Sequence, residues 1–333
     1  MASTNCQLPQ LSDMRFDPIS ARPTLFAKIR AKRPEGPSVC PGCNEGETPP
    51  AVCVFPQGSP LNSPGWQIRV VPNKFPCLAP SGGNLHYDLG SGFNGIKDPS
   101  GRCEVLFETA RHNSPIYKRS QEEVVFLLRA LVSRYEFARS EPQAKLFLGF
   151  KNMGKVAGGT LEHEHWQIYS LSFIPPAIQD RYDRAVHFYN RTGRSLYRDM
   201  FSAEDASGER VVSATEHFIT FVPFAAGTPY ELRIAPRRDS ADFSTMTGDE
   251  LIDFSRALRD AVARLCDVKS DLAYNVVLDT ASFENARAPW FCWSLSIIPR
   301  ITTIAGVELG LDVMINPVSP EDAAAELRAA SVK

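Results

Sequence analysis

The amino-acid sequence of 333 residues lacks the features that mark membrane, secreted and nucleic-acid-binding proteins. No apolar run approaches the roughly 18 residues that a membrane-spanning helix needs, and the N-terminal MASTNCQLPQ lacks the charged-then-apolar order of a secretory signal. The net charge is −2, so the chain carries no general excess of positive charge that would attract nucleic acid. These absences predict a cytoplasmic protein that binds neither a membrane nor nucleic acid.

Closely spaced cysteines and histidines are also few. Of eight cysteines only Cys40 and Cys43 form a tight pair. In a reducing compartment, Cys-x-x-Cys is typical of a metal-binding or redox-active site and not of a disulfide framework. Two of the six histidines, His163 and His165, lie one residue apart, shortly after a pair of glycines.

Two parts of the chain follow the same plan. Capping boxes at Ser120 and Thr247, which lie 127 residues apart, each predict the start of an amphipathic helix. The same step along the chain carries His165 onto Cys292, and a similar apolar strand follows each of them. This shared register indicates two copies of one helix-and-sheet unit, of which the first carries the histidines.

The paired histidines fall in a strand predicted over about 161–173. Because side chains alternate along a strand, His163, His165 and Gln167 should share one face. The glycines before them can bring backbone N–H groups close to an anion, and the Thr160 hydroxyl would add a further polar group. An imidazole beside such a phosphate seat can attack phosphorus. Taken alone, His-x-His fits a pair of surface histidines equally well.

A longer stretch, FKNMGKVAGGTLEHEHWQ at 150–167, resembles the active-site signature of the galactose-1-phosphate uridylyltransferase family, a branch of the histidine triad superfamily. The C-terminal residues 306–328 are most similar to the ADP-glucose phosphorylase branch of that family. The resemblance covers about residues 15–328. Shorter segments that match in family order are RAKRP at 30–34, CPGC at 40–43, VVPNKFP at 70–76 and ETARH at 108–112.

The resemblance implies a nucleotidyltransferase with His165 as its nucleophile. In a ping-pong cycle, His165 would take a nucleoside monophosphate from a nucleotide-sugar and pass it to a sugar-1-phosphate or to phosphate. Gln167 is implied as a second catalytic residue, and its amide, which cannot shuttle a proton, favours transfer to a phosphate over hydrolysis. The implied substrate-binding residues are Arg30, Arg33, Asn73, Lys74, Asn152, Gly158, Gly159, Thr160 and Glu308.

The resemblance also implies one structural zinc ion per chain. Two cysteines at this spacing with two distant histidines are a tetrahedral zinc set without an open position. Such a metal would tie the irregular N-terminal segment to the strand of the nucleophile. The implied ligands are Cys40, Cys43, His112 and His163.

The implied fold is α+β, with two histidine-triad-like units that each have an antiparallel sheet and flanking helices, joined as a half-barrel. Residues 1–175 would form the catalytic unit with its zinc site, and residues 176–333 a degenerate second unit. The family is usually dimeric with the active site near the subunit interface, so we expect a homodimer.

The chain departs from the family pattern at three positions. Glu164 replaces a proline that would restrict φ, Thr160 replaces a serine, and Cys292 stands where the second half often has histidine. We expect Glu164 to face away from the phosphate as a solvated or salt-bridged carboxylate, and Cys292 to be a small buried thiol.

Two alternatives remain open beside the uridylyltransferase reaction. One is a phosphorylase or adenylyltransferase of the ADP-glucose type, which would use inorganic phosphate as acceptor. The other is a zinc-stabilised nucleotide-binding protein without turnover. A zinc-dependent nucleic-acid binder is disfavoured, because the chain has a single Cys-x-x-Cys and an acidic pI of about 6.3.

Overall fold

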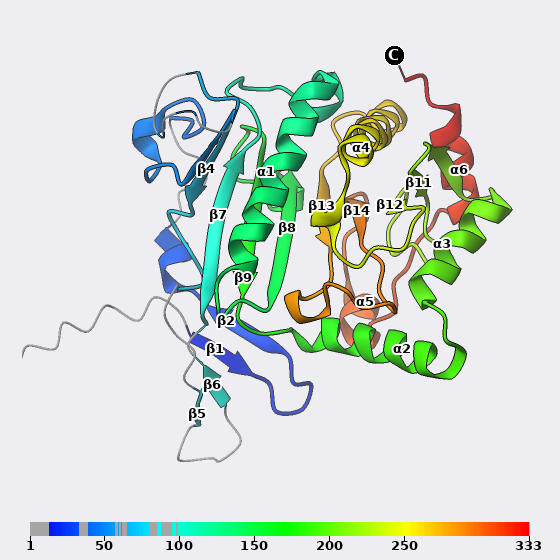
Figure 1. Cartoon of the computed structure of the whole chain (residues 1–333), viewed down its shortest axis with the longest axis horizontal. Helices are drawn as coiled ribbons and strands as arrows, with labels where there is room; N and C mark the ends of the chain where they lie inside the picture. The colour runs from blue at the N-terminus through cyan, green and yellow to red at the C-terminus, as the bar shows by residue number, and fades with distance from the viewer. Residues whose placement is uncertain are drawn as a thin grey trace, which may run out of the picture.

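One antiparallel sheet of ten strands runs through the molecule (Figure 1). The computed structural model describes residues 13–32, 39–56, 59, 61, 65–79, 85–87, 95–97 and 99–332. The strand order is β10-β11-β12-β14-β13-β8-β9-β7-β4-β3, and every neighbouring pair is antiparallel. In chain order the strands are β3 Cys53–Phe55, β4 Ile68–Pro72, β7 Gly101–Phe107, β8 Leu146–Met153, β9 His165–Leu171, β10 Val211–Ala214, β11 Phe218–Phe221, β12 Leu232–Pro236, β13 Tyr274–Asp279 and β14 Ser294–Pro299.

The sheet consists of two five-strand halves with the same internal order. The first half runs β3-β4-β7-β9-β8 and the second runs β10-β11-β12-β14-β13. The halves meet where β8 pairs with β13, with Gly149 opposite Leu278. The predicted α+β class is therefore confirmed, and the sheet stays open. The division of the chain between residues 175 and 176 remains a prediction, which falls between β9 and the helix α2 (Pro176–Thr192).

Helices α1 (Gln121–Arg139) and α4 (Gly248–Val268) lie side by side across one face of the sheet (Figure 1). Both begin with the predicted capping boxes, at Ser120 and Thr247, whose hydroxyls accept the backbone N–H of the glutamate at the third helical position. In each half, that glutamate also forms a salt bridge with an arginine. The two bridges are Arg111–Glu123 and Arg238–Glu250.

The main hydrophobic core lies between the sheet and these helices. Trp166 and Ile168 from β9 and Trp293 and Leu295 around β14 are buried in it. Helix α6 (Pro320–Ala329) closes the far end of this core through Leu327. Because side chains alternate along a strand, the residues between these positions face the opposite side of the sheet.

The opposite side of the sheet is covered differently in the two halves. In the second half, Phe201 of helix α3 (Leu196–Ser207) packs with Cys292 in one apolar cluster. The thiol of Cys292 is buried, as expected. In the first half this side is covered by N-terminal segments, with Val54 and Trp66 packed on Phe107.

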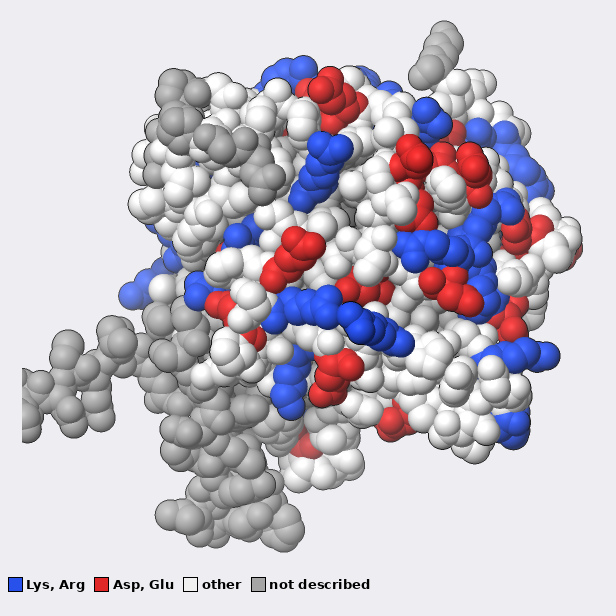
Figure 2. All heavy atoms as spheres, in the orientation of Figure 1, with Lys and Arg blue, Asp and Glu red and all other residues white. Residues whose placement is uncertain are grey.

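Smaller elements complete the description. A four-stranded sheet has the order β2-β1-β6-β5. Among the described residues, no helix is both long and apolar enough to cross a membrane. Acidic and basic side chains are interspersed on the face drawn in Figure 2. The four strands are β1 Asp13–Phe16, β2 Pro23–Phe26, β5 Leu85–Tyr87 and β6 Gly95–Lys97.

Candidate active site and metal site

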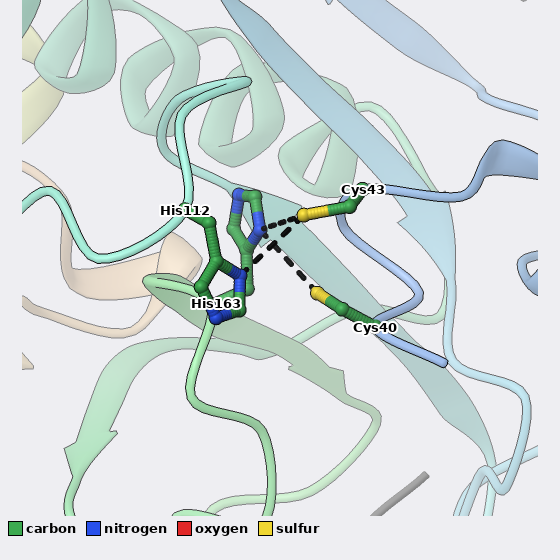
Figure 3. Close-up of side chains that lie close together, drawn as sticks. All are labelled: Cys40, Cys43, His112 and His163. Carbon is green, nitrogen blue, oxygen red and sulfur yellow. Dashed lines mark hydrogen bonds between the residues drawn. The ribbon is translucent and has the colours of Figure 1, made fainter. Parts of the chain in front are cut away.

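The four predicted metal ligands come together on the side of the sheet that faces away from α1 (Figure 3). Their ligand atoms all lie within 4.8 Å of one another. The sulfur of Cys43 is 3.4 Å from Nδ1 of His112, and Nδ1 of His163 is 3.5 Å from the sulfur of Cys40. In a tetrahedral zinc site, with Zn–S of about 2.3 Å and Zn–N of about 2.05 Å, sulfur and nitrogen ligands lie roughly 3.6 Å apart. The donor set and its spacing therefore fit zinc.

The surroundings of His163 prepare it to bind a metal through Nδ1. Its Nε2 donates a hydrogen bond to the carbonyl oxygen of Thr109 at 2.7 Å, which leaves the lone pair on Nδ1. Burial lowers the pKa of His163, and this favours the neutral imidazole that a metal requires. Gly42 packs on the ring so closely that a Cβ there would lie 2.5 Å from it, which explains the glycine between Cys40 and Cys43.

His165 occupies the start of β9 and faces a cavity of about 230 Å³. Its Nδ1 is 2.8 Å from the carbonyl oxygen of His163. Because a carbonyl oxygen only accepts, Nδ1 carries the proton and the lone pair is on Nε2. Strand β9 starts at His165 and is therefore shorter than the strand predicted over 161–173. A hydrogen bond from the N–H of Glu108 to the carbonyl oxygen of Glu164 continues its pairing with β7 by one residue.

The cavity has apolar walls and a polar end. Val71, Val105 and Phe107 come from β4 and β7, and Phe75 and Leu161 come from the loops above them. Val71 and Phe75 belong to the VVPNKFP segment that matches the family, whereas nothing local in the sequence distinguishes Val105, Phe107 and Leu161 from core residues. The predicted site residues that line the cavity are Asn73, Lys74, Thr160, His165 and Gln167.

The glycine loop is held in place by a residue from the second half. Nδ2 of Asn275 on β13 donates to the Oδ1 of Asn152 at 2.8 Å and to the carbonyl oxygen of Ala157 at 2.9 Å. Gly158 has φ +83°, and a Cβ on Gly159 would lie 2.7 Å from the backbone oxygen of Asn152. Both positions therefore require glycine. Sequence analysis missed Asn275, since only the β8–β13 pairing brings it to the loop.

Glu164 faces away from the cavity as a salt-bridged carboxylate, which was one of the two expected states, and it is buried. Its carboxylate contacts the ammonium group of Lys151 and lies 3.8 Å from Arg119. Glu108 joins the same cluster, 2.6 Å from Lys151 and 2.6 Å from Arg119. Each of these four side chains is at most 3% exposed, and we call them the buried ion quartet. Burial opposes ionisation of Glu108, but the charges of Lys151 and Arg119 outweigh it and lower the pKa of this carboxyl group.

The described residues predicted to bind substrate that do not line the cavity are Arg30, Asn152, Gly158, Gly159 and Glu308. Arg30, in the 3-10 helix Lys28–Lys32, donates to the hydroxyl of Tyr169 at 3.1 Å, so it lies along the same face of β9 as His165. Glu308 lies in helix α5 (Gly306–Leu311), where its carboxylate accepts the N–H of Ala305. Arg33 is outside the described residues.

Several known proteins are similar to this chain. A family profile described as Domain of unknown function (DUF4931) N-terminal domain matches residues 84–174. ADP-glucose phosphorylase of Arabidopsis thaliana is 27% identical, over 97% of this chain and 94% of that protein. Galactose-1-phosphate uridylyltransferase of Thermotoga maritima is 26% identical, over 97% of this chain and 100% of that protein.

Solved structures agree with these relatives over nearly the whole chain. A structure described as uridylyltransferase has a TM-score of 0.80 at 25% identity, covering 95% of this chain and 97% of the other. An ADP-glucose phosphorylase from Arabidopsis thaliana with bound ADP-glucose has a TM-score of 0.75 at 26% identity, covering 96% and 99%. By sequence and by fold, the chain is therefore similar over nearly its whole length to galactose-1-phosphate uridylyltransferases and to ADP-glucose phosphorylase, which are nucleotidyl-transferring enzymes.

Proposed function

We propose that this protein transfers a nucleoside monophosphate from a sugar nucleotide to a second phosphate group through a covalent intermediate on His165. The observation that carries the proposal is the environment of His165, whose ring lines the cavity while its Nδ1 donates to the carbonyl oxygen of His163. With the proton held on Nδ1, Nε2 presents the lone pair that attacks phosphorus.

Two displacements at phosphorus make up the cycle. In the first, Nε2 of His165 bonds to the α-phosphorus, and the bond from phosphorus to the bridging oxygen breaks, so that its electron pair leaves with the sugar-1-phosphate. In the second, an oxygen of the acceptor phosphate attacks, and the P–N electron pair returns to Nε2. Gln167 and Thr160, which also line the cavity, donate hydrogen bonds to the phosphate oxygens.

The cavity suits a nucleoside beside that phosphate. Its walls of Val71, Phe75 and Phe107 offer an apolar surface for a base, and Asn73 and Lys74 offer polar groups for the sugar. The glycine loop supplies backbone N–H groups for the phosphate, as glycine-rich anion sites do.

The proposal is tested with a sugar nucleotide radiolabelled at the α-phosphate. We expect the wild-type protein to acquire an acid-labile, alkali-stable label and the His165→Ala variant to acquire none. His187→Ala, which removes an exposed histidine of α2, is the control and should label fully. Full labelling of His165→Ala would refute the assignment.

A phosphorylase is the second candidate. It is favoured by the 27% identity to ADP-glucose phosphorylase over 97% of the chain. In that reaction inorganic phosphate is the acceptor, and the products are a nucleoside diphosphate and a sugar-1-phosphate. Comparing the turnover of labelled protein by inorganic phosphate and by hexose-1-phosphate distinguishes the two, and a panel of sugar nucleotides identifies the base.

The metal site is proposed to hold one structural zinc ion. Two thiolates and two imidazoles fill a tetrahedron, so the metal would have no open position for substrate. Its contribution would be a cross-link from the turn at Cys40–Cys43 to His163, two residues before the nucleophile.

We also propose that the protein is a homodimer. The segment 301–315 exposes large apolar side chains, including Leu309 at 76% and Leu311 at 71% of their surface. Exposed apolar surface of this kind marks an interface between subunits. An active site near that interface would account for Glu308 lying outside the cavity of its own chain.

A further inference from the structure

Glu164 lies between the metal-site histidine and the proposed nucleophile, and its side chain points to the opposite side of the sheet. There it enters the buried ion quartet, whose other members come from three separate elements. Glu108 follows β7, Arg119 precedes α1 and Lys151 lies on β8. The quartet therefore joins the segment 163–165 to the framework of the first half.

We propose that Glu164 is a positioning residue that fixes the peptide group between His163 and Glu164. The carbonyl oxygen of this peptide is the acceptor for Nδ1 of His165. Its orientation decides which nitrogen of His165 carries the proton. The inference rests on the proposed function of His165 as nucleophile.

The peptide is held at both ends. On one side, Nε2 of His163 donates to the carbonyl oxygen of Thr109 at 2.7 Å. On the other side, the carbonyl oxygen of Glu164 accepts the N–H of Glu108 at 3.2 Å, and the Glu164 carboxylate contacts Lys151. Without the ionic contact, the Glu164 end can rotate, and the carbonyl oxygen of His163 then moves away from the imidazole.

The second half of the chain shows that this fold does not need a charged residue immediately before the helix-capping residue. Arg119 immediately precedes the capping residue Ser120, and Met246 holds the same place before Thr247. Both Arg119 and Met246 are buried. Buried ions lose their hydration, so apolar residues of similar volume can stabilise the folded state at least as much as a buried ion pair does. The quartet therefore belongs to the half that carries the site.

Glu164 also stands where the family signature usually has proline. A proline restrains its position through the fixed φ angle. Glu164 lacks that restraint on φ. Its side-chain contacts with Lys151 and Arg119 restrain the backbone at this position instead.

The first test compares Glu164→Gln with Glu104→Gln. Glu104 is paired with Arg134 at 2.6 Å, is also buried and lies on the neighbouring strand β7, opposite Ile168 and so away from the two histidines. Both variants break a buried ion pair and should lower the melting temperature. Only Glu164→Gln should slow the labelling of His165, by about tenfold or more with KM nearly unchanged, because misplacing a reacting group costs rate rather than binding.

The second measurement does not depend on activity. Nitrogen-15 NMR of the histidine rings, in zinc-loaded protein, reports which nitrogen of His165 carries the proton. We expect the Nδ1–H form in the wild type and in Glu104→Gln, and a mixture of both forms in Glu164→Gln. If wild-type protein takes up no label while the NMR difference is found, the proposed function is wrong and the positioning inference stands.

A double variant separates positioning from stability. Lys151→Met with Glu164→Leu removes one cation and one anion together, so the remaining Glu108–Arg119 pair stays neutral. We expect this variant to keep its zinc and its melting temperature and still to label slowly, with mixed protonation of His165. A labelling rate and an NMR spectrum like those of the wild type, in this variant or in Glu164→Gln, would overturn the inference.

Discussion

Asn275 connects the second half of the chain to the glycine loop by side-chain hydrogen bonds. It sits on β13 opposite Asn152 of β8, and its amide bridges the side chain of Asn152 and the backbone of Ala157. Asn152 in turn lies against Gly158 and Gly159. One amide therefore fixes both ends of the loop that we propose to hold the phosphate.

Replacing Asn275 by alanine should loosen this loop without unfolding the protein. Two hydrogen bonds are lost, at a cost of about 1 kcal/mol each in the free energy of unfolding. We expect zinc content to be unchanged and kcat/KM for the sugar nucleotide to fall by roughly tenfold. Asn285→Ala is the matched control, because Asn285 donates to Ser282 in a 3-10 helix away from the cavity. Equal losses of activity in the two variants would show that the loop does not depend on Asn275.

At the scale of elements, the turn at Cys40–Cys43 contacts the segment just before β9 through the side chain of His163. The turn is closed locally, by hydrogen bonds from Cys43 N and Asn44 N to the carbonyl oxygen of Cys40. Gly42 in this turn packs against the ring of His163, two residues before the start of β9. A metal held by these ligands would be the main link between the two elements.

Removing the metal should therefore destabilise the first half. We expect chelation, or Cys43→Ser, to release one zinc ion per chain and to lower the free energy of unfolding by several kcal/mol, since binding energy at a structural zinc site is folding energy. Thermal unfolding and metal analysis measure both effects. Cys266→Ser, at a half-buried thiol of α4, is the control and should keep its zinc. Equal stability of the apo protein would contradict a structural role for the metal.

At the scale of the whole molecule, the two halves share a sheet and differ in what covers its second side. In the second half, Phe201 of α3 and Cys292 fill the space with apolar groups. In the first half, the polar residues His165 and Gln167 face a cavity there. One framework thus carries a site in one half and a packed core in the other.

The apolar segment 301–315 should set the oligomeric state. We expect wild-type protein to sediment as a dimer and Leu309→Asp with Leu311→Asp to sediment as a folded monomer, because a charge in an apolar interface is costly. Ile19→Asp changes a side chain that is 96% exposed in the turn between β1 and β2 and should leave the dimer intact. If the wild-type protein sediments as a monomer, the proposed interface is wrong.

The sequence by itself determined the features that depend on spacing along one element. The capping boxes at Ser120 and Thr247 have local hydrogen bonds, so both helix starts could be predicted. Strand alternation put His165 and Glu164 on opposite faces, as the structure has them. Spacing alone indicated a metal or redox site only at Cys40 and Cys43, and the resemblance to the family added His112 and His163 as the other ligands.

Tertiary structure alone decided which distant groups meet. Alternation along the strand predicted that Glu164 faces away from the cavity. It did not predict the salt bridges of Glu164 with Lys151 and Arg119, since these residues come from different elements. For the same reason, Asn275 and the wall residues Val105 and Phe107 could not be found from the sequence. Charge pairing and cavity shape depend on how strands are ordered in the sheet, and local residue patterns do not specify that order.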